Sequence, residues 1–180
     1  MDDRHVISVL VENQFGVLAR IAGLFSGKGF NIDSLCVAET PDPRYSRMTL
    51  VTHGDERVID QTVKQLNKLI DVIRVSDLTH EAHVERELVL VKVAAEGSTR
   101  GEIIQIAEIF RARIVDVASK SLTIETTGDE GKINALINML RPYGLMEVAR
   151  TGKIALSRGT RRMSDATSRG AEEEPLREGV

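Results

Sequence analysis

The feature that most constrains the fold is an internal repeat, because the second half of the chain repeats the apolar pattern of the first. In each half an apolar strand ends in a short loop that contains glycine, and a helix with one apolar face follows. The loop glycines, Gly16 and Gly101, are 85 residues apart. The helical positions keep that spacing, so that Leu18, Ile21, Ala22 and Phe25 correspond to Ile103, Ile106, Ala107 and Phe110.

Each half of the chain predicts the order strand, helix, strand, strand, helix, strand. Asp55 and Asp129 are predicted N-caps of the second helix in each half, and Thr99 with Glu102 forms a capping box at the first helix of the second half. The order is that of the split βαβ arrangement, a four-stranded sheet with both helices on one face. We therefore predict an α+β chain of two tandem ferredoxin-like βαββαβ domains. The predicted strands are 5–11, 31–40, 46–53 and 71–78, then 87–95, 114–119, 121–127 and 146–156.

The domain boundaries follow from this order of elements. The first domain covers residues 1–79, the polar segment 80–86 (HEAHVER) is the link, and the second domain covers residues 87–159. Residues 160–180 are charged and poor in large apolar side chains, so we expect them to be disordered.

Charge and composition exclude several classes of partner. Aromatic residues make up only 3% of the chain and its net charge is −3, so neither base stacking nor phosphate binding is favoured, and we expect no nucleic-acid partner. No apolar run approaches the roughly 20 residues that span a bilayer, so we expect no membrane partner. A single cysteine, Cys36, excludes an internal disulfide and fits a reducing compartment. We expect a soluble cytoplasmic protein.

The chain carries no recognisable catalytic or metal-binding motif. His80 and His83 have HxxH spacing, which differs from the HExxH of a zinc site, and the motifs GxSxG, CxxC and GxxxxGK are absent. An enzyme that acts on an acyl phosphate would need an arginine in the Asn13–Gly16 loop to bind the phosphoryl group, and that loop has none. Binding is therefore favoured over catalysis, and we expect no catalytic, cofactor-binding or metal-binding residue.

The loop before the first helix is the candidate binding site. Gly16 lets the backbone approach a ligand closely, and the N–H groups near Phe15, Gly16 and Val17 lie at the positive end of a helix, which favours an anion. Asn13 adds a carbonyl acceptor and an amide donor. A carboxylate bound by the backbone and an ammonium bound by an asparagine would together match a free amino acid.

Asn31, at the far side of the same helix, offers a second amide, and aliphatic residues follow it. The alternative interpretation is an ordinary strand-to-helix turn, with Asn31 capping the next connection. In the second half of the chain, Ser98 and Ile114 take the places of the two asparagines. The fold thus recurs without the candidate ligand groups, which indicates that they are dispensable for folding. The expected aliphatic walls of the site are Ile32, Leu35, Val37 and Ala38.

Several stretches of the chain resemble the regulatory small subunit of acetohydroxyacid synthase (acetolactate synthase), whose N-terminal half is an ACT domain. They include VLVENQFGVLARIAGLFSGKGFNIDSL, PDPRYSRMTLVTHGDE and EVARTGKIALSRG. The run HVERELVLVKV is not generic to ACT domains. The resemblance covers residues 4 to about 159 and leaves out the acidic tail.

The resemblance implies a regulatory subunit without catalytic residues that binds and activates a catalytic (large) subunit. Thiamine diphosphate, magnesium and FAD are expected in that partner, and no cofactor in this chain. The family confers feedback inhibition by valine on branched-chain amino acid biosynthesis, and leucine or isoleucine remain open as effectors. Valine is expected between the ACT domains of a homodimer, at positions matching Asn13, Gly16 and Asn31, with Ala38 at a position associated with valine sensitivity.

A second function remains open. The chain could be a stand-alone sensor or interaction protein with tandem ACT-like domains and no acetohydroxyacid synthase partner. An effect of the chain on the rate of a catalytic subunit would separate the two functions.

Overall fold

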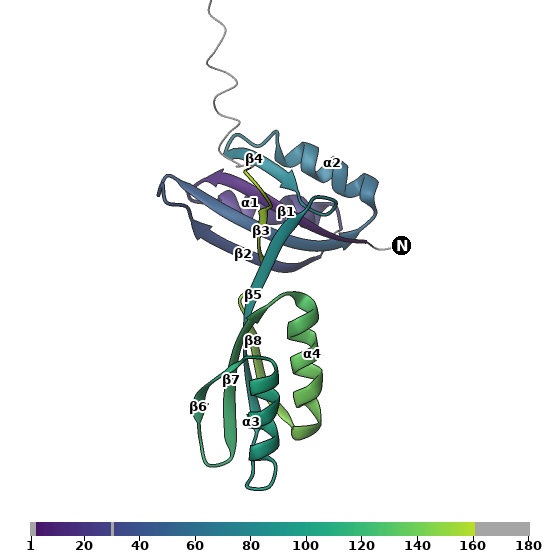
Figure 1. The fold of residues 1–180 in the computed structure, drawn as a ribbon. Coiled ribbons are helices and arrows are strands. Elements are labelled where there is room, and N and C mark those ends of the chain that lie inside the picture. The colour runs from purple at the N-terminus through teal and green to yellow at the C-terminus, as the bar shows by residue number, and fades with distance from the viewer. Residues whose placement is uncertain (1–2, 30, 161–180) are drawn as a thin grey trace, which may run out of the picture. The chain divides into compact units, whose positions relative to one another are not determined.

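The structure is a computed structural model that describes residues 3–29 and 31–160 (Figure 1). The chain forms two compact units, each built around its own sheet. The predicted tail, residues 160–180, lies outside the described residues except for Thr160. In the described part of the chain, every helix is too short or too polar to cross a bilayer.

The first unit is a four-stranded antiparallel sheet in the order β2-β3-β1-β4, with two helices. The side chains from His5 to Val11 are all buried, as predicted for a strand covered on both faces, and β1 has an inner position between β3 and β4. β2 is an edge strand. The elements are β1 (Asp3–Glu12), α1 (Val17–Gly27), β2 (Ile32–Glu39), β3 (Tyr45–Gly54), α2 (Glu56–Leu66) and β4 (Val72–Asp77).

The second unit repeats this topology in the order β6-β7-β5-β8, with β9 pairing with β5 outside that path. The helices α3 and α4 lie side by side on one face of its sheet (Figure 1). The prediction of two tandem ferredoxin-like domains is confirmed. The elements are β5 (His83–Ala94), α3 (Arg100–Ile109), β6 (Arg113–Val117), β7 (Ser121–Gly128), α4 (Glu130–Leu140), the 3-10 helix η1 (Arg141–Tyr143), β8 (Leu145–Arg150) and β9 (Ile154–Ser157).

The cores are aliphatic and come from the predicted helix faces and central strands. In the second unit, Ile103, Ile106 and Ala107 of α3 pack with the central strands. In the first unit, the buried face of α1 is Val17, Ile21 and Phe25. Two predicted members of the apolar stripes lie outside the core. Leu18 is 44% exposed, and Ile70 follows the end of α2 and is 88% exposed.

Most predicted strand ends agree with the structure to within two residues, and two predictions differ more. β5 begins at His83, inside the segment 80–86 that the sequence assigns to a link, because residues 83–86 continue the alternation of the strand they lead into. The single strand predicted for 146–156 is divided into β8 and β9. Gly152 lies in the break with φ of 83°, a backbone conformation that interrupts a strand.

Two of the three predicted helix caps are confirmed, and one is wrong. The Asp55 side chain accepts from the N–H of Arg57 and that of Asp129 from the N–H of Lys132, as predicted. The capping box is wrong, because Thr99 has near-helical backbone angles and its hydroxyl donates to the Glu96 carbonyl at 3.2 Å. Its predicted partner is engaged elsewhere, since Tyr143 Oη donates to a carboxylate oxygen of Glu102 at 2.9 Å.

Candidate functional site

The loop between β1 and α1 presents unpaired backbone donors. The N–H of Asn13 donates to the Arg44 carbonyl at 2.7 Å, which fixes the start of the loop. Gly16 is the N-cap of α1 with φ of 83°, and no side chain in the described part of the protein caps the helix. The first N–H groups of a helix have no acceptor within it, so the first turn of α1 can bind an anionic group.

The side chain of Asn13 is anchored by its amide nitrogen. Nδ2 donates to Glu39 Oε1 at 2.9 Å and to the Pro43 carbonyl at 3.0 Å, so both of its protons are used. Among the described residues, no donor reaches its Oδ1. Asn13 is exposed, and its carbonyl oxygen is therefore available to a ligand.

The loop that anchors Asn13 is itself held by an exposed ion pair. The backbone and guanidinium N–H groups of Arg44 donate to the Asp42 carboxylate on the other side of Pro43. These hydrogen bonds hold the pKa of the Asp42 carboxyl below its usual value, and those from the Arg44 side chain have the largest effect. The pair closes a tight turn whose middle residue supplies the carbonyl for Asn13.

Asn31 lies just before β2 and is anchored in a similar way. Its Nδ2 donates to Asp33 Oδ1 at 3.0 Å, and its backbone carbonyl accepts from Thr52 Oγ1 at 2.7 Å. Asp33 also binds His53, with 2.6 Å between Oδ2 and Nδ1. The Asn31 side chain is exposed, and no described residue donates to its Oδ1.

The structure does not bring Asn13 and Asn31 together within one chain. α1 separates them, and its 11 residues at about 1.5 Å each make a helix about 16 Å long. The strand β2 gives the same result, because Asn13 contacts Glu39 at its last residue and Asn31 precedes Ile32 at its first. The two asparagines thus mark opposite ends of one edge strand.

The other predicted site residues divide between these two ends. Phe15 belongs to the loop at the Asn13 end, and its side chain is fully exposed. Val17 is buried, so that it can offer a ligand its backbone N–H but no side chain. Ala38 is exposed beside Glu39, whereas Ile32 is partly buried beside Asn31.

Sequence reasoning did not find the residues that anchor the two asparagines. Asp33 could have been proposed from its position two residues after Asn31, because side chains two residues apart on an extended segment lie on the same face. No local signal links Asn13 with Glu39, or Asp33 with His53, because these pairs are 26 and 20 residues apart.

The corresponding loop of the second unit has a different conformation. α3 begins at Arg100, so Gly101 lies inside the helix and outside the left-handed region, and the prediction that this glycine is a loop glycine like Gly16 is wrong. The Arg100 guanidinium links the start of α3 to the turn between β6 and β7, because its Nη2 donates to the carbonyls of Ala118 and Ser119 at 2.6 and 2.9 Å.

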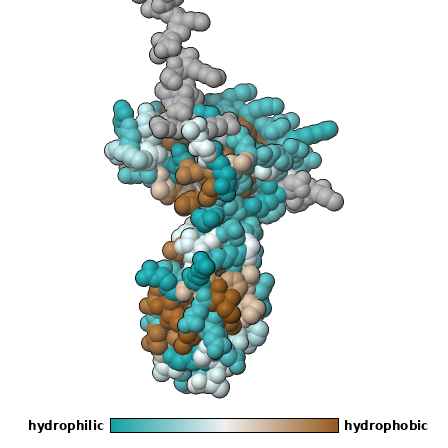
Figure 2. All heavy atoms as spheres, viewed as in Figure 1, coloured by the Kyte–Doolittle hydropathy of each residue, from teal (hydrophilic) through white to brown (hydrophobic). Residues whose placement is uncertain are grey.

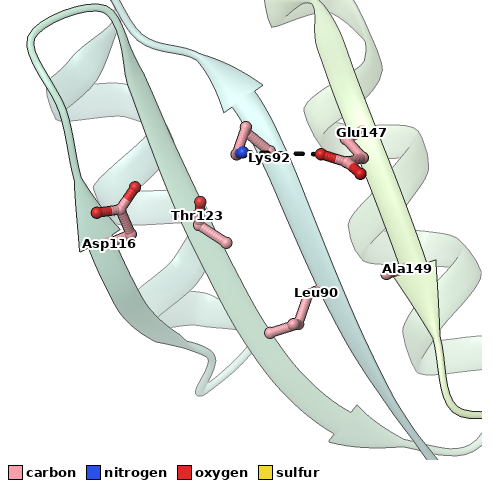
Figure 3. A pocket seen from close by; sticks show the side chains of 6 residues that line it. All are labelled: Leu90, Lys92, Asp116, Thr123, Glu147 and Ala149. Atoms are coloured by element: carbon pink, nitrogen blue, oxygen red, sulfur yellow. Dashed lines mark ion pairs between the residues drawn. The ribbon is translucent and has the colours of Figure 1, made fainter.

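The second unit has a shallow hollow elsewhere, on the face of its sheet away from the helices. Its volume is about 210 Å³. Figure 3 shows Lys92 directed toward Glu147, with 3.7 Å between Nζ and Oε2, while Asp116 lies on the other side of Thr123. Apolar side chains also reach the surface of this unit (Figure 2), including Val117 and Met146. The hollow is separate from the loop that corresponds to the Asn13 loop. It is lined by Leu90, Lys92, Asp116, Thr123, Glu147 and Ala149.

Two family profiles match the two units. The profile of the "AHAS small subunit-like ACT domain" matches residues 7–74, and that of the "Small subunit of acetolactate synthase" matches residues 86–159. Together they cover both ferredoxin-like domains and end before the acidic tail.

Curated relatives and a solved structure match over nearly the whole chain. The probable acetolactate synthase small subunit of Archaeoglobus fulgidus is 55% identical over 88% of this chain and 99% of that protein. The isozyme 3 small subunit of Escherichia coli K12 is 50% identical over 89% of this chain and 99% of its own. The crystal structure of the small subunit from Thermotoga maritima is 40% identical, with a TM-score of 0.79, and covers 88% of this chain and 99% of that one.

These matches extend through both domains, and the relatives are matched over almost their full lengths. The stretches that carry the resemblance, including HVERELVLVKV, lie within the matched ranges. The chain therefore belongs to the family of acetolactate synthase small subunits, the regulatory subunits of that enzyme.

Proposed function

We propose that this chain activates a catalytic acetolactate synthase subunit and makes it sensitive to valine. The observation that carries the proposal is the division of the predicted site between the two ends of β2. A homodimer in which two β2 edges pair antiparallel would bring the Asn13 end of one copy to the Asn31 end of the other. Each dimer would then hold two identical effector sites, each built from both chains.

The exposed surface near these ends supports such a pairing. β2 is an edge strand, and edge strands carry unpaired backbone groups that another chain can satisfy. Phe15 is fully exposed, and Leu18 and Val37 are 44% and 40% exposed. Burial of such apolar side chains by a second copy would favour dimerisation.

The energetics of valine binding also favour a site that is closed by a second chain. Burying the valine side chain contributes roughly 1.5 to 3 kcal/mol, and a carboxylate at a helix N-terminus adds about 0.3 to 1 kcal/mol in an exposed site. An open loop would therefore bind valine weakly. Exclusion of water by a partner strengthens both contributions and links ligand occupancy to subunit geometry, for which a coupling of about 1 to 3 kcal/mol is sufficient.

In this proposal the chemistry belongs to the partner. Thiamine diphosphate, magnesium and FAD are assigned to the catalytic subunit, and this chain contributes binding and regulation. Isoleucine differs from valine by one methylene, about 0.8 kcal/mol of burial. Valine is therefore proposed as the effector from the family, with isoleucine and leucine as the competitors to measure.

The direct test is a pull-down and activity assay with the cognate catalytic subunit, with and without valine. We expect the chain to copurify with the catalytic subunit and to raise its rate. Added valine should lower the rate of the complex again. Calorimetry with valine, leucine and isoleucine measures the effector affinity. A chain that leaves the rate unchanged would support the stand-alone sensor instead.

The two-chain site has its own test. Asn13→Ala and Asn31→Ala should each abolish valine binding, but unfolding and reassembling the two variants together should restore about one site in four. The restored site pairs the intact loop of one chain with the intact Asn31 of the other. Each variant reassembled alone is the matched control, and an absence of recovery in the mixture would show that the site does not span two chains.

A further inference from the structure

The amide groups of both asparagines are held in one orientation by the protein. Glu39 Oε1 and the Pro43 carbonyl can only accept, so Asn13 must direct Nδ2 toward them. Asp33 Oδ1 imposes the same condition on Asn31, because a carboxylate accepts hydrogen bonds and donates none. The carbonyl oxygen of each asparagine is consequently open to a ligand, and Asn31 also keeps the second proton of its Nδ2.

Asp33 is in turn fixed by His53. The two oxygens of Asp33 have separate partners, since Oδ1 accepts from Asn31 and Oδ2 lies 2.6 Å from His53 Nδ1. For this contact the imidazole must carry its proton on Nδ1. The side chains of Asp33 and His53 are 37% and 47% exposed, so these hydrogen bonds lie at the surface.

We propose that Asp33, held by His53, is a positioning residue that makes the Asn31 end of the site specific for a protonated amine. This inference rests on the proposed effector site. Because Asp33 fixes the orientation of the amide, Asn31 presents its carbonyl oxygen at a defined position, and an ammonium group with three donors suits that acceptor. The site then selects an amino acid over the 2-hydroxy acid of the same shape.

The second unit supplies a matched control for this arrangement. Asp116 corresponds to Asp33 in the repeat, but Ile114 stands where the first unit has Asn31. Asp116 lies opposite Thr123 in the sheet and lines the hollow of the second unit. A change at Asp116 therefore removes an equivalent charge without touching an asparagine amide.

The experiment compares valine with 2-hydroxy-3-methylbutanoate, which keeps the carboxylate and the side chain and lacks the ammonium. Asp33→Asn can present either an oxygen or an NH₂ group to Asn31, so the Asn31 amide is free to turn. The loss of one charge-assisted hydrogen bond should weaken valine binding about tenfold. The hydroxy acid should lose less, so the selectivity ratio should fall, while Asp116→Asn should leave both affinities unchanged.

A second pair of variants keeps the proposal falsifiable if Asp33→Asn does not fold. His53→Gln retains an N–H donor for Asp33 and should keep most of the selectivity, whereas His53→Leu removes the donor and should lower it. Rescue by glutamine is not expected of a residue that only fills space.

Each result decides between the proposals. An equal loss for both ligands in Asp33→Asn, or an unchanged ratio, would overturn the positioning role while the effector site stands. An unchanged selectivity ratio in both His53 variants would show that His53 is not needed to hold Asp33. An absence of valine binding by the wild-type chain would instead overturn the proposed function itself.

Discussion

The two helix-opening loops differ although they belong to repeats of one fold. In the first unit, Gly16 opens α1 in a left-handed conformation without a side-chain cap, and Asn13 is anchored with its carbonyl oxygen exposed. In the second unit, α3 starts from Thr99, whose backbone is near-helical, and the Arg100 side chain donates to carbonyl groups of the turn between β6 and β7. The two loops thus differ in backbone conformation and in their polar side chains, while neither helix start has a side-chain cap among the described residues.

The difference shows which residues the fold requires and which it leaves free. Both units build the same topology, and both carry a buried isoleucine at the corresponding helix position, Ile21 and Ile106. The loop residues differ without a change of topology. The apolar pattern thus determines the fold, and the loops are available for separate functions.

The largest expected effect tests the shared part of the comparison. Ile21→Ala and Ile106→Ala each remove a buried side chain and should each lower the free energy of unfolding by about 2 to 5 kcal/mol. Urea unfolding followed by circular dichroism measures both. A loss below about 1 kcal/mol in either variant would show that the two cores are not equivalent.

Gly16→Asp tests the difference between the loops. A Cβ added at Gly16 meets no atom of the described residues within 4 Å apart from its chain neighbours, so the expected loss comes from the left-handed backbone and from a carboxylate beside the anion site. Valine binding should weaken by about 2 kcal/mol, or about thirtyfold, in calorimetry. Gly101→Asp lies in the first turn of α3 and is the matched control, which should leave valine affinity unchanged. Retained affinity in Gly16→Asp would place the carboxylate elsewhere.

The helix caps give a smaller effect, which distinguishes the confirmed cap Asp129 from Thr99, whose predicted cap is absent among the described residues. Asp129→Ala removes a side chain that accepts from the Lys132 N–H at 2.9 Å, and it should lower the free energy of unfolding by about 1 kcal/mol. Thr99→Ala removes no cap, so a change of only a few tenths, roughly 0.3 kcal/mol, is expected. Equal losses in the two variants would contradict the cap assignment. Thermal unfolding of both variants provides the measurement.

The smallest effect concerns the loop that anchors Asn13. Arg44→Ala should raise the pKa of the Asp42 carboxyl, because the hydrogen bonds from Arg44 hold that pKa below its usual value. Since the folded-state pKa is depressed, the contact stabilises the turn at neutral pH and is lost as the pH falls through that pKa. An NMR titration of the Asp42 carboxyl in both proteins measures the shift. An unchanged pKa would mean that Arg44 does not hold this turn in solution.

The fold was predictable from the sequence because its determinants are local and periodic. The stripe that includes Ile21 and Phe25 recurs at a constant spacing, and Asp55 and Asp129 cap the helices they precede. The errors arose where a local pattern has two meanings. Thr99 and Glu102 have capping-box spacing, but the backbone of Thr99 is already near-helical, so its side chain cannot reach the helix amides.

The candidate site was predictable only in its groups and not in its geometry. Gly16 and the asparagines can be read from the sequence, and their chemistry suggests an amino acid. Their separation along β2 depends on the path of the sheet, and their amide orientations depend on Glu39 and Asp33. The Glu39 contact joins segments far apart in sequence, so no local pattern encodes it.

The position of Asn13 and Asn31 at opposite ends of an edge strand has a consequence for regulation in the cell. If each effector site needs two chains, the number of sites at low concentration rises with the square of the chain concentration. Valine in turn would stabilise the dimer by mass action. Sensitivity to the end product would then depend on how much of the subunit is made, as well as on how tightly each site binds.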